Sequence, residues 1–290
     1  MRILITGASG FLGSALRAHW ARHEVCTLGR GGRSDFQWEP TDGEMDATAL
    51  EGIGTVVHLA GESLGPGRWT AGKKARIRES RIQGTKLLCQ QIAQSDSPPK
   101  VLLAASGIGF YGDCGDTEVD ESAPQGAGFL AELCGEWEEA TRPAQEVGVR
   151  VVHLRLGIVL GAEGGALAAM RLPFRLGLGG RLGSGQQWMP WIGLADTVRA
   201  VDFLMTNDSA EGPVNLVSAA VRNLEFTKAL GSALKRPTLL PVPAWGLRLL
   251  LGEAAEEMLL SSTRGQPGRL GALGFEPQHR TLPEALAAAL

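Results

Sequence analysis

The sequence has few cysteines and no cluster of basic residues, and each shortage excludes a class of protein. Its 290 residues include four cysteines, Cys26, Cys89, Cys114 and Cys134, without a CxxC pair. Neither a disulfide framework nor a zinc-binding site is therefore indicated. The formal net charge of -3, without a lysine- and arginine-rich block, argues against binding to nucleic acid or to an anionic membrane.

Long hydrophobic runs are also missing. No apolar run reaches the roughly 18 residues of a membrane span, and the N-terminal run Ile3–Ile5 is too short for a signal peptide. His19 and His23 have the spacing of a metal pair, but the sequence supplies no third ligand, so we expect no metal. We expect a cytoplasmic protein whose partners are an unidentified small-molecule substrate and a second copy of the chain in a homodimer.

Short apolar segments alternate with segments of helical spacing along the first two thirds of the chain. This alternation is typical of the α/β class and predicts a Rossmann-type doubly wound parallel sheet. From Gly157 onward glycine becomes dense, which we interpret as the border of a smaller C-terminal α/β substrate lobe. We therefore predict a dinucleotide-binding domain over residues 1–165, to which 190–206 returns, and a lobe over 166–290. The expected strands are 3–6, 24–28, 54–59, 101–105, 150–156 and 214–217.

A glycine-rich turn between the first strand and the first helix predicts a dinucleotide site. Gly7 permits a tight turn, Gly10 lets backbone amides approach a pyrophosphate, and Gly13 permits close packing of the helix on the strand. The N-terminus of the following helix favours the phosphate charge. An ordinary strand-to-helix turn is the alternative interpretation. The cofactor contacts predicted here are Thr6, Gly7, Ser9, Gly10, Phe11, Leu12 and Gly13.

The end of the second strand indicates which dinucleotide is bound. NAD-binding sites carry an acidic residue about 20 residues after the glycine turn, where it bonds the ribose hydroxyl. This chain has Gly29 and Arg30 there. Because a guanidinium suits phosphate geometry, Arg30 favours the 2′-phosphate of NADP(H). A solvated loop cation is the alternative interpretation of Arg30.

Several motifs resemble those of the extended short-chain dehydrogenase/reductase family, in the same order and spacing. More narrowly, the chain resembles the atypical, YfcH-like epimerase group over nearly its whole length. This resemblance implies a small C-terminal domain at about 237–290 and an NADP(H) site that also includes Leu59, Ala60, Gly61, Glu62, Ala105, Ser106, Leu156 and Gly157. The motifs are Thr6–Gly13, Val56–Gly61, Arg68-Trp69, Ser106–Asp113, Leu133–Glu138, Leu154–Gly161 and Pro173–Gly180.

The resemblance also implies a catalytic set that this chain does not carry. Enzymes of the family use a tyrosine, a lysine four residues later that lowers its pKa, and a serine that orients the substrate. Matching the motif puts Phe129, Leu133 and Gly107 at these positions, so the usual mechanism cannot run. Tyr111 is our first candidate for a replacement acid and Ser106 the second. Packing of Tyr111 as a loop aromatic is the alternative.

Two functions from different classes fit these observations. The first is an NADP-dependent oxidoreductase acting on a small carbonyl, alcohol or sugar-nucleotide-like compound, and the second is a non-catalytic NADP(H) sensor or partner-binding protein. Epimerase chemistry through transient oxidation is a third reading, which needs the same missing base. The apolar segment Trp188–Ile192 and the glycine run 177–185 either line a pocket or join the two lobes.

Overall fold

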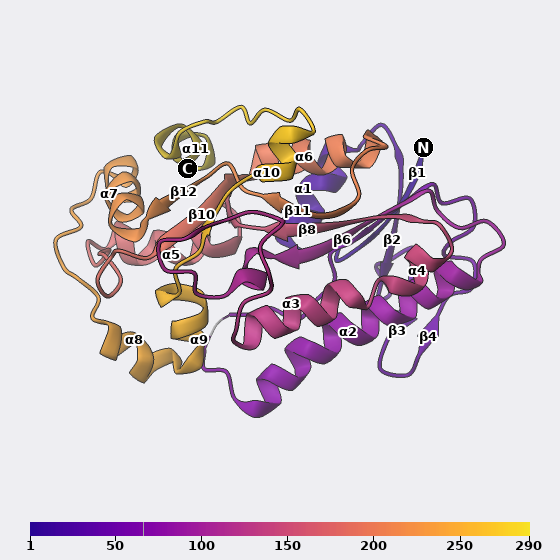
Figure 1. Cartoon of the computed structure of the whole chain (residues 1–290), viewed down its shortest axis with the longest axis horizontal. Coiled ribbons are helices and arrows are strands. Elements are labelled where there is room, and N and C mark those ends of the chain that lie inside the picture. The colour runs from indigo at the N-terminus through magenta and orange to yellow at the C-terminus, as the bar shows by residue number, and fades with distance from the viewer. Residues whose placement is uncertain (66) are drawn as a thin grey trace.

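The computed structural model describes residues 1–65 and 67–290, and its centre is an eight-stranded sheet (Figure 1). Its strand order is β11-β8-β6-β5-β1-β2-β3-β4, and neighbours pair in parallel except β3 with β4. The predicted doubly wound parallel sheet is confirmed. The strands are β1 Arg2–Thr6, β2 Glu24–Gly29, β3 Phe36–Glu39, β4 Glu44–Met45, β5 Thr55–His58, β6 Val101–Gly107, β8 Arg150–Leu156 and β11 Gly212–Leu216.

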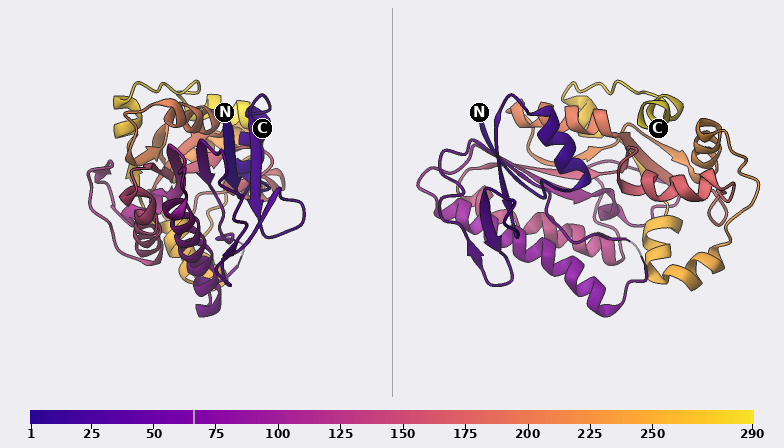
Figure 2. Two further views of the ribbon diagram at one scale, coloured as in Figure 1. Left: turned by 90° about the vertical axis from the view of Figure 1, so that its right-hand side faces the viewer. Right: turned by 180° about the vertical axis from the view of Figure 1, so that it is seen from behind.

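Helices cover both faces of this sheet, which explains why its central strands are continuous apolar runs (Figures 1 and 2). Ile3 and Ile5 of β1 join the core beneath α1 and α6, whereas Leu4 joins the core beneath α2 and α4. The chain changes winding direction between β1 and β5, and ligands bind at the carboxyl ends of strands at such a point. The helices are α1 Phe11–His19, α2 Ala71–Gln94, α3 Phe129–Glu139, α4 Arg142–Glu146 and α6 Leu194–Thr206.

A second, smaller lobe is built around a three-stranded sheet with the order β12-β10-β9. Trp191 and Phe226 are almost fully buried in its core. Between β10 and β11 the chain returns to the large sheet, because Val198 and Val201 of α6 pack in the same core as Ile3. The elements are β9 Ile158–Leu160, α5 Gly165–Arg175, β10 Trp188–Gly193, β12 Ala219–Arg222, α7 Asn223–Leu234, α8 Ala244–Leu251, α9 Glu253–Ala255, a π-helical turn Glu256–Leu260, α10 Gly268–Ala272 and α11 Leu282–Ala289.

Two local details follow from residue chemistry. Pro143 lies in the first turn of α4, where its missing N–H is not needed, so α4 starts as a separate helix shortly after α3 ends. Thr281 and Glu284 form a reciprocal capping box that starts α11. The remaining strands, β7 Glu118–Val119 and β13 Arg264–Gly265, pair with each other and are too short to leave a periodic signal.

The described residues contain no helix that is both long and apolar enough to span a membrane. Within the same residues, no group of three or more His, Cys, Asp and Glu side chains is arranged to hold a metal ion.

Candidate functional site

The glycine turn adopts a conformation that only small residues allow. Gly7 has φ +68°, and a Cβ atom there would lie 2.7 Å from the carbonyl carbon of Leu59. A Cβ atom on Gly13 would lie 2.3 Å from the carbonyl oxygen of Gly7. Gly10 precedes α1, and no side chain among the described residues caps this helix. The amides of the first turn of α1 are therefore available to an anion.

A buried hydrogen-bond network fixes the ends of β1 and β5 beside this turn. The Thr6 hydroxyl lies 2.7 Å from His58 Nδ1 and accepts hydrogen bonds from the amides of Leu59 and Ala60, at 3.1 and 3.2 Å. His58 Nε2 lies 2.9 Å from the Thr85 hydroxyl. Burial lowers the pKa of His58 to about 4, so its ring is neutral at pH 7. Thr6 is itself fully buried, so its hydroxyl positions the ends of β1 and β5, and its predicted cofactor contact stays a prediction.

A cleft of about 620 Å³ runs from the glycine turn across the strand ends to the second lobe. Most of the residues predicted to bind the cofactor line this cleft. Those that line it are Gly7, Gly10, Phe11, Leu12, Gly13, Leu59, Ala105, Ser106, Leu156 and Gly157.

The other predicted cofactor residues lie around the cleft. Arg30 is exposed in the loop after β2, and Ser9 is exposed in the glycine turn. Gly61 lies against the guanidinium of Arg81, which lines the cleft. Glu62 pairs with Lys73 at 2.9 Å. Their contacts with a cofactor stay predictions.

The ring of Phe11 connects the glycine turn to the glycine-dense region. A Cβ atom on Gly161 would lie 2.6 Å from this ring, and one on Gly164 would lie 2.5 Å from it. The absence of side chains at these positions therefore makes room for Phe11. Helix α5, which begins directly afterwards, supplies Ala166 and Met170 to the cleft.

Helix α3, the helix that carries the motif for the family's tyrosine and lysine, presents an apolar face to the cleft. The cleft-lining residues are Leu130, Leu133, Cys134 and Trp137. Phe129 instead packs against Trp69, with ring centroids 5.3 Å apart. Of the two positions that the motif assigns, Leu133 lines the cleft and Phe129 does not, whereas Leu130 and Cys134 are four residues apart and both line it. Burial raises the pKa of the Cys134 thiol to about 11.

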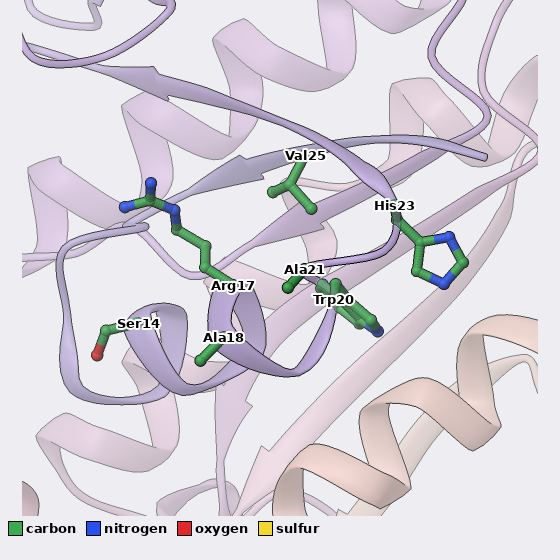
Figure 3. Close-up of a pocket in the computed structure, with 7 residues that line it drawn as sticks. All are labelled: Ser14, Arg17, Ala18, Trp20, Ala21, His23 and Val25. Carbon is green, nitrogen blue, oxygen red and sulfur yellow. The ribbon is translucent and has the colours of Figure 1, made fainter.

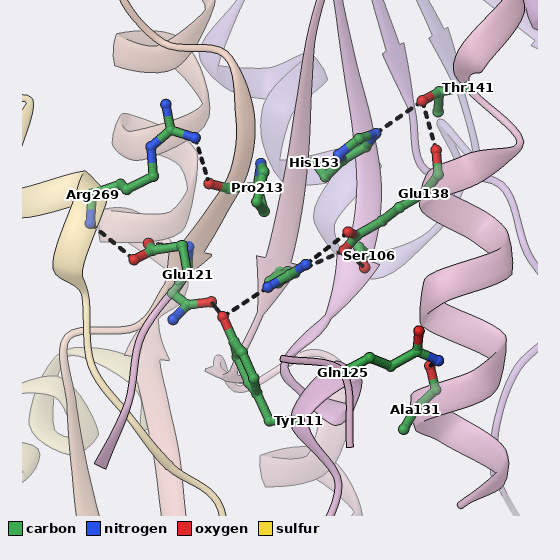
Figure 4. Close-up of polar contacts among 12 residues, drawn as sticks. Ser106, Tyr111, Glu121, Gln125, Ala131, Glu138, Thr141, His153, Pro213 and Arg269 are labelled. Atoms are coloured by element: carbon green, nitrogen blue, oxygen red, sulfur yellow. Dashed lines mark hydrogen bonds and ion pairs between the residues drawn. The ribbon is translucent and has the colours of Figure 1, made fainter. Parts of the chain in front are cut away.

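Beneath the cleft, Ser106 is tied to a buried ion pair (Figure 4). Its hydroxyl donates to Glu138 at 2.7 Å. Arg155 donates to both carboxylate oxygens of Glu138 at 2.8 Å, and its third nitrogen donates to the Tyr111 hydroxyl at 2.8 Å. The Tyr111 hydroxyl in turn donates to Asn215 at 2.9 Å.

This network gives the two predicted catalytic residues different positions. Ser106 lines the cleft at the carboxyl end of β6. Tyr111 is only 2% exposed, and burial raises the pKa of its hydroxyl. Because that hydroxyl is already engaged by Arg155 and Asn215, the contacts give Tyr111 a structural role. Its role as an acid stays a prediction without geometric support.

The C-terminal part of the chain closes the cleft. The π-helical turn contributes Glu256, Glu257, Met258 and Leu259 to the lining. The carboxylate of Glu257 also accepts hydrogen bonds from the first amides of α3, those of residues 129 and 130. This segment was missed at the level of sequence, since it has no periodic pattern and lies far from the glycine turn.

The segment Trp188–Ile192 fulfils both interpretations made from the sequence. Trp188, Met189 and Pro190 line the cleft, whereas Trp191 and Ile192 are buried in the two cores. Trp137, within the motif Leu133–Glu138, also lines the cleft, as does Arg81, whose sequence context gave no signal for this.

A separate surface groove of about 400 Å³ lies beside α1 (Figure 3). Its lining side chains come from α1, from the turn that follows it and from the start of β2, including Arg17, Trp20 and Val25. It therefore lies at the amino edge of the parallel strands, opposite the edge where Rossmann ligands bind. We assign the functional site to the larger cleft.

Comparison with known proteins agrees with this geometry. The family model described as "NAD dependent epimerase/dehydratase family" matches residues 3–217, and a domain of unknown function, DUF1731, matches residues 242–289. An epimerase family protein of Mycobacterium bovis is 44% identical over 98% of this chain and 96% of its own length. The crystal structure of human epimerase family protein SDR39U1 (isoform 2) with NADPH has a TM-score of 0.92 and 32% identity, and covers 100% of this chain and 99% of that one.

A nucleoside-diphosphate sugar epimerase of Corynebacterium glutamicum is also similar in structure. Its TM-score is 0.82 at 32% identity, with 100% of this chain and 58% of that chain covered. The predicted resemblance to epimerase-like short-chain dehydrogenase/reductases with a small C-terminal domain is confirmed. The glycine turn and the sheet order agree with the family match. The chain belongs to the NAD dependent epimerase/dehydratase family.

Proposed function

We propose that this protein binds NADPH in the large cleft and uses it to reduce a carbonyl group of a small molecule. The observation that carries the proposal is that the glycine turn opens directly into the cleft, which continues past Ser106 into the second lobe. The similar human protein crystallised with NADPH supports the choice of cofactor.

The end of β2 fits the 2′-phosphate of NADPH. Arg30 and Arg33 are exposed in the loop that follows this strand. The nearby carboxylate of Asp35 is turned toward Thr27, whose amide and hydroxyl both donate to it at 2.8 Å. These hydrogen bonds lower the pKa of Asp35 and keep its oxygens engaged. The loop therefore offers guanidinium groups to a phosphate.

The residues around the cleft define how a reduction would proceed. When bound, the dihydronicotinamide supplies a hydride to the carbonyl carbon, and the carbonyl oxygen then takes up a proton. Ser106 offers the oxygen at the carboxyl end of β6 that can orient this group. Its proton is engaged by Glu138, which also pairs with Arg155 at 2.8 Å. The product oxygen would thus be protonated from water, and we expect slower turnover than in enzymes with a tyrosine–lysine pair.

One observation favours a second candidate, a non-catalytic NADPH sensor. The cleft-facing residues of α3, which are all among those the structure describes, include no tyrosine and no lysine. Cys134 cannot replace them at neutral pH, because burial keeps its thiol protonated.

Calorimetric titration of the purified protein with NADPH, NADP, NADH and NAD tests the cofactor. Gly13→Val is the matched control, since its side chain would collide with the carbonyl oxygen of Gly7 and should abolish binding. NADPH carrying deuterium at the transferable position, incubated with a panel of ketones, tests the chemistry. Deuterium in the alcohol product would establish reduction. Tight NADPH binding without any transfer would favour the sensor.

A further inference from the structure

We infer that the cleft selects an uncharged, largely apolar carbonyl compound and excludes nucleoside diphosphate sugars. This inference rests on the proposed function and names its substrate class. It runs against the expectation raised by the sugar-nucleotide epimerase among the similar structures. Three features of the cleft carry it, namely its apolar lining, the position of its cation and the state of its carboxylates.

The part of the cleft beyond the strand ends is lined mainly by hydrocarbon and thioether side chains. They come from both lobes and from the C-terminal turn, so they would surround a ligand in the cleft on several sides. Burying apolar surface against such a lining favours a ligand in proportion to its own apolar area. Representative lining residues are Leu130, Leu133, Ile158, Leu182, Met189 and Met258.

Among the cleft-lining residues in the described part of the chain, Arg81 is the sole lysine or arginine. Its guanidinium donates to the carbonyl oxygens of Glu62 and Ile77, at 3.0 and 3.1 Å, and lies 4.9 Å from the Trp137 ring. A Cβ atom on Gly61 would lie 3.1 Å from its guanidinium carbon, so Arg81 lies beside the segment that follows β5. We call this side of the cleft, which includes the glycine turn, the cofactor half. We call the other side, which the second lobe and the C-terminal turn line, the substrate half. A second ligand that carries a diphosphate would therefore meet no cleft-lining lysine or arginine there.

Two arginines flank the cleft-lining residue Trp188, and each has an acidic partner. Arg222 and Arg264 flank the Trp188 ring at 4.3 and 4.5 Å. Arg222 pairs with Asp116 at 2.7 Å, and Arg264 pairs with Glu118 at 2.9 Å. Their charges are neutralised locally, so they provide no phosphate site.

Three carboxylates line the substrate half, and each is bound within the protein. Asp113 accepts hydrogen bonds from the amides of Gly115 and Ser262, at 3.0 and 3.3 Å. Glu256 pairs with Arg248, and Glu257 caps α3. The negative charges of Asp113 and Glu257, whose partners are backbone amides, oppose a diphosphate, and the existing partners of all three carboxylates leave none free for an amine. A neutral carbonyl compound carries no diphosphate and needs no free carboxylate, so neither feature opposes its binding.

The test measures ligand affinity on the wild-type protein loaded with NADP. Methyl ketones of rising chain length, from butanone to decanone, are compared by calorimetry with UDP and UDP-glucose. We expect the ketone dissociation constant to fall about three- to fourfold per added methylene, with no detectable heat from UDP or UDP-glucose. Binding of UDP-glucose more tightly than decanone, or ketone affinity independent of chain length, would overturn the inference.

NADPH titration of the same preparation separates this inference from the proposed function. Failure of NADPH to bind, with ketone affinity still rising with chain length in the unloaded protein, would reject the proposed cofactor chemistry and leave the ligand class standing. NADPH binding without ketone binding would reject the ligand class alone.

A charge variant provides an independent check. Met258 lines the cleft and is 43% exposed, so Met258→Arg should fold and place a cation beside the ligand. We expect it to weaken decanone binding at least tenfold and to give measurable UDP binding. Leu239→Arg, at a site 86% exposed, is the control and should change neither. A folded Met258→Arg protein with unchanged decanone and UDP affinity would contradict the inference.

Discussion

The carboxylate of Glu257 lies 3.1 Å from the backbone nitrogen of Leu130 and accepts its hydrogen bond. It accepts a second from the preceding amide at 3.0 Å, so the C-terminal part of the chain caps α3. Glu257→Ala should lower the free energy of unfolding by about 1 kcal/mol, as loss of an N-cap does. Glu253→Ala removes an exposed ion pair with Lys74 and should cost about 0.5 kcal/mol or less. Equal losses in urea unfolding would contradict the capping role.

The ion pair between Arg155 and Glu138 is buried and bidentate. Arg155→Met leaves a buried carboxylate without its partner and should lower the free energy of unfolding by about 3–5 kcal/mol. The double variant Arg155→Met/Glu138→Leu removes both charges and should recover more than half of this loss. Denaturant unfolding of both singles and the double measures the coupling. Strictly additive losses would show that the pair is not coupled.

His58 should make stability depend on pH. Its pKa is about 4 in the folded protein because burial opposes protonation, against 6.5 for the free side chain. The unfolded state therefore binds the proton first as the pH falls. The contribution of His58 is complete above pH 6.5 and is lost toward pH 4, by up to about 3 kcal/mol.

Comparing the wild type with a variant that lacks the imidazole separates the effect of His58 from that of other titrating groups. Unfolding free energies of the wild type and of His58→Gln are compared at neutral and at acid pH. The wild type should lose more stability than the variant between the two conditions. An identical loss in both proteins would rule out His58 as the source.

Tyr111→Phe tests the role of the single tyrosine. The variant removes a hydroxyl that joins Arg155 to Asn215, and it should lower the free energy of unfolding by about 1–3 kcal/mol. NADPH affinity and any ketone reduction, measured by calorimetry and by deuterium transfer, should stay unchanged. Loss of turnover with unchanged stability would instead identify Tyr111 as the acid.

Arg30→Ala tests the selectivity for NADPH. Loss of one charge-assisted contact with the 2′-phosphate should weaken NADPH binding by about tenfold or more, while NADH binding should stay the same. Arg22→Ala is the control, since Arg22 is exposed between α1 and β2, at the amino edge of the strands. Similar loss of both nucleotides in Arg30→Ala would remove this residue from the phosphate site.

The sequence was sufficient for the features that depend on local chemistry. The apolar runs that become β1, β5 and β6 and the glycines at positions 7, 10 and 13 leave strong signals, because burial on both faces and backbone close approach restrict the residue types. Arg81 and Glu257 could not be found in this way. Each lines the cleft only because distant elements pack together, and a charged residue on a helix usually marks a solvated face.

The cleft-lining residues of α3 show a second limit of prediction from the sequence. Matching the family motif puts the tyrosine position at Phe129, yet Leu130 is the residue that lines the cleft. One residue corresponds to about 100° around a helix, so an offset of one moves a side chain away from the cleft, as for Phe129, which packs against Trp69. Motif matching identifies the helix that borders the cleft, whereas packing decides which side of that helix faces the cleft.

The contact between Phe11 and the glycines at 161 and 164 joins two segments that are far apart in the chain. A side chain added at either glycine would displace the ring, and a smaller residue at position 11 would leave a void beside the glycine turn. We therefore expect substitutions at these three positions to be energetically coupled. Among relatives of this protein, an aromatic residue at position 11 should occur together with glycine at positions 161 and 164, and the three should be lost together.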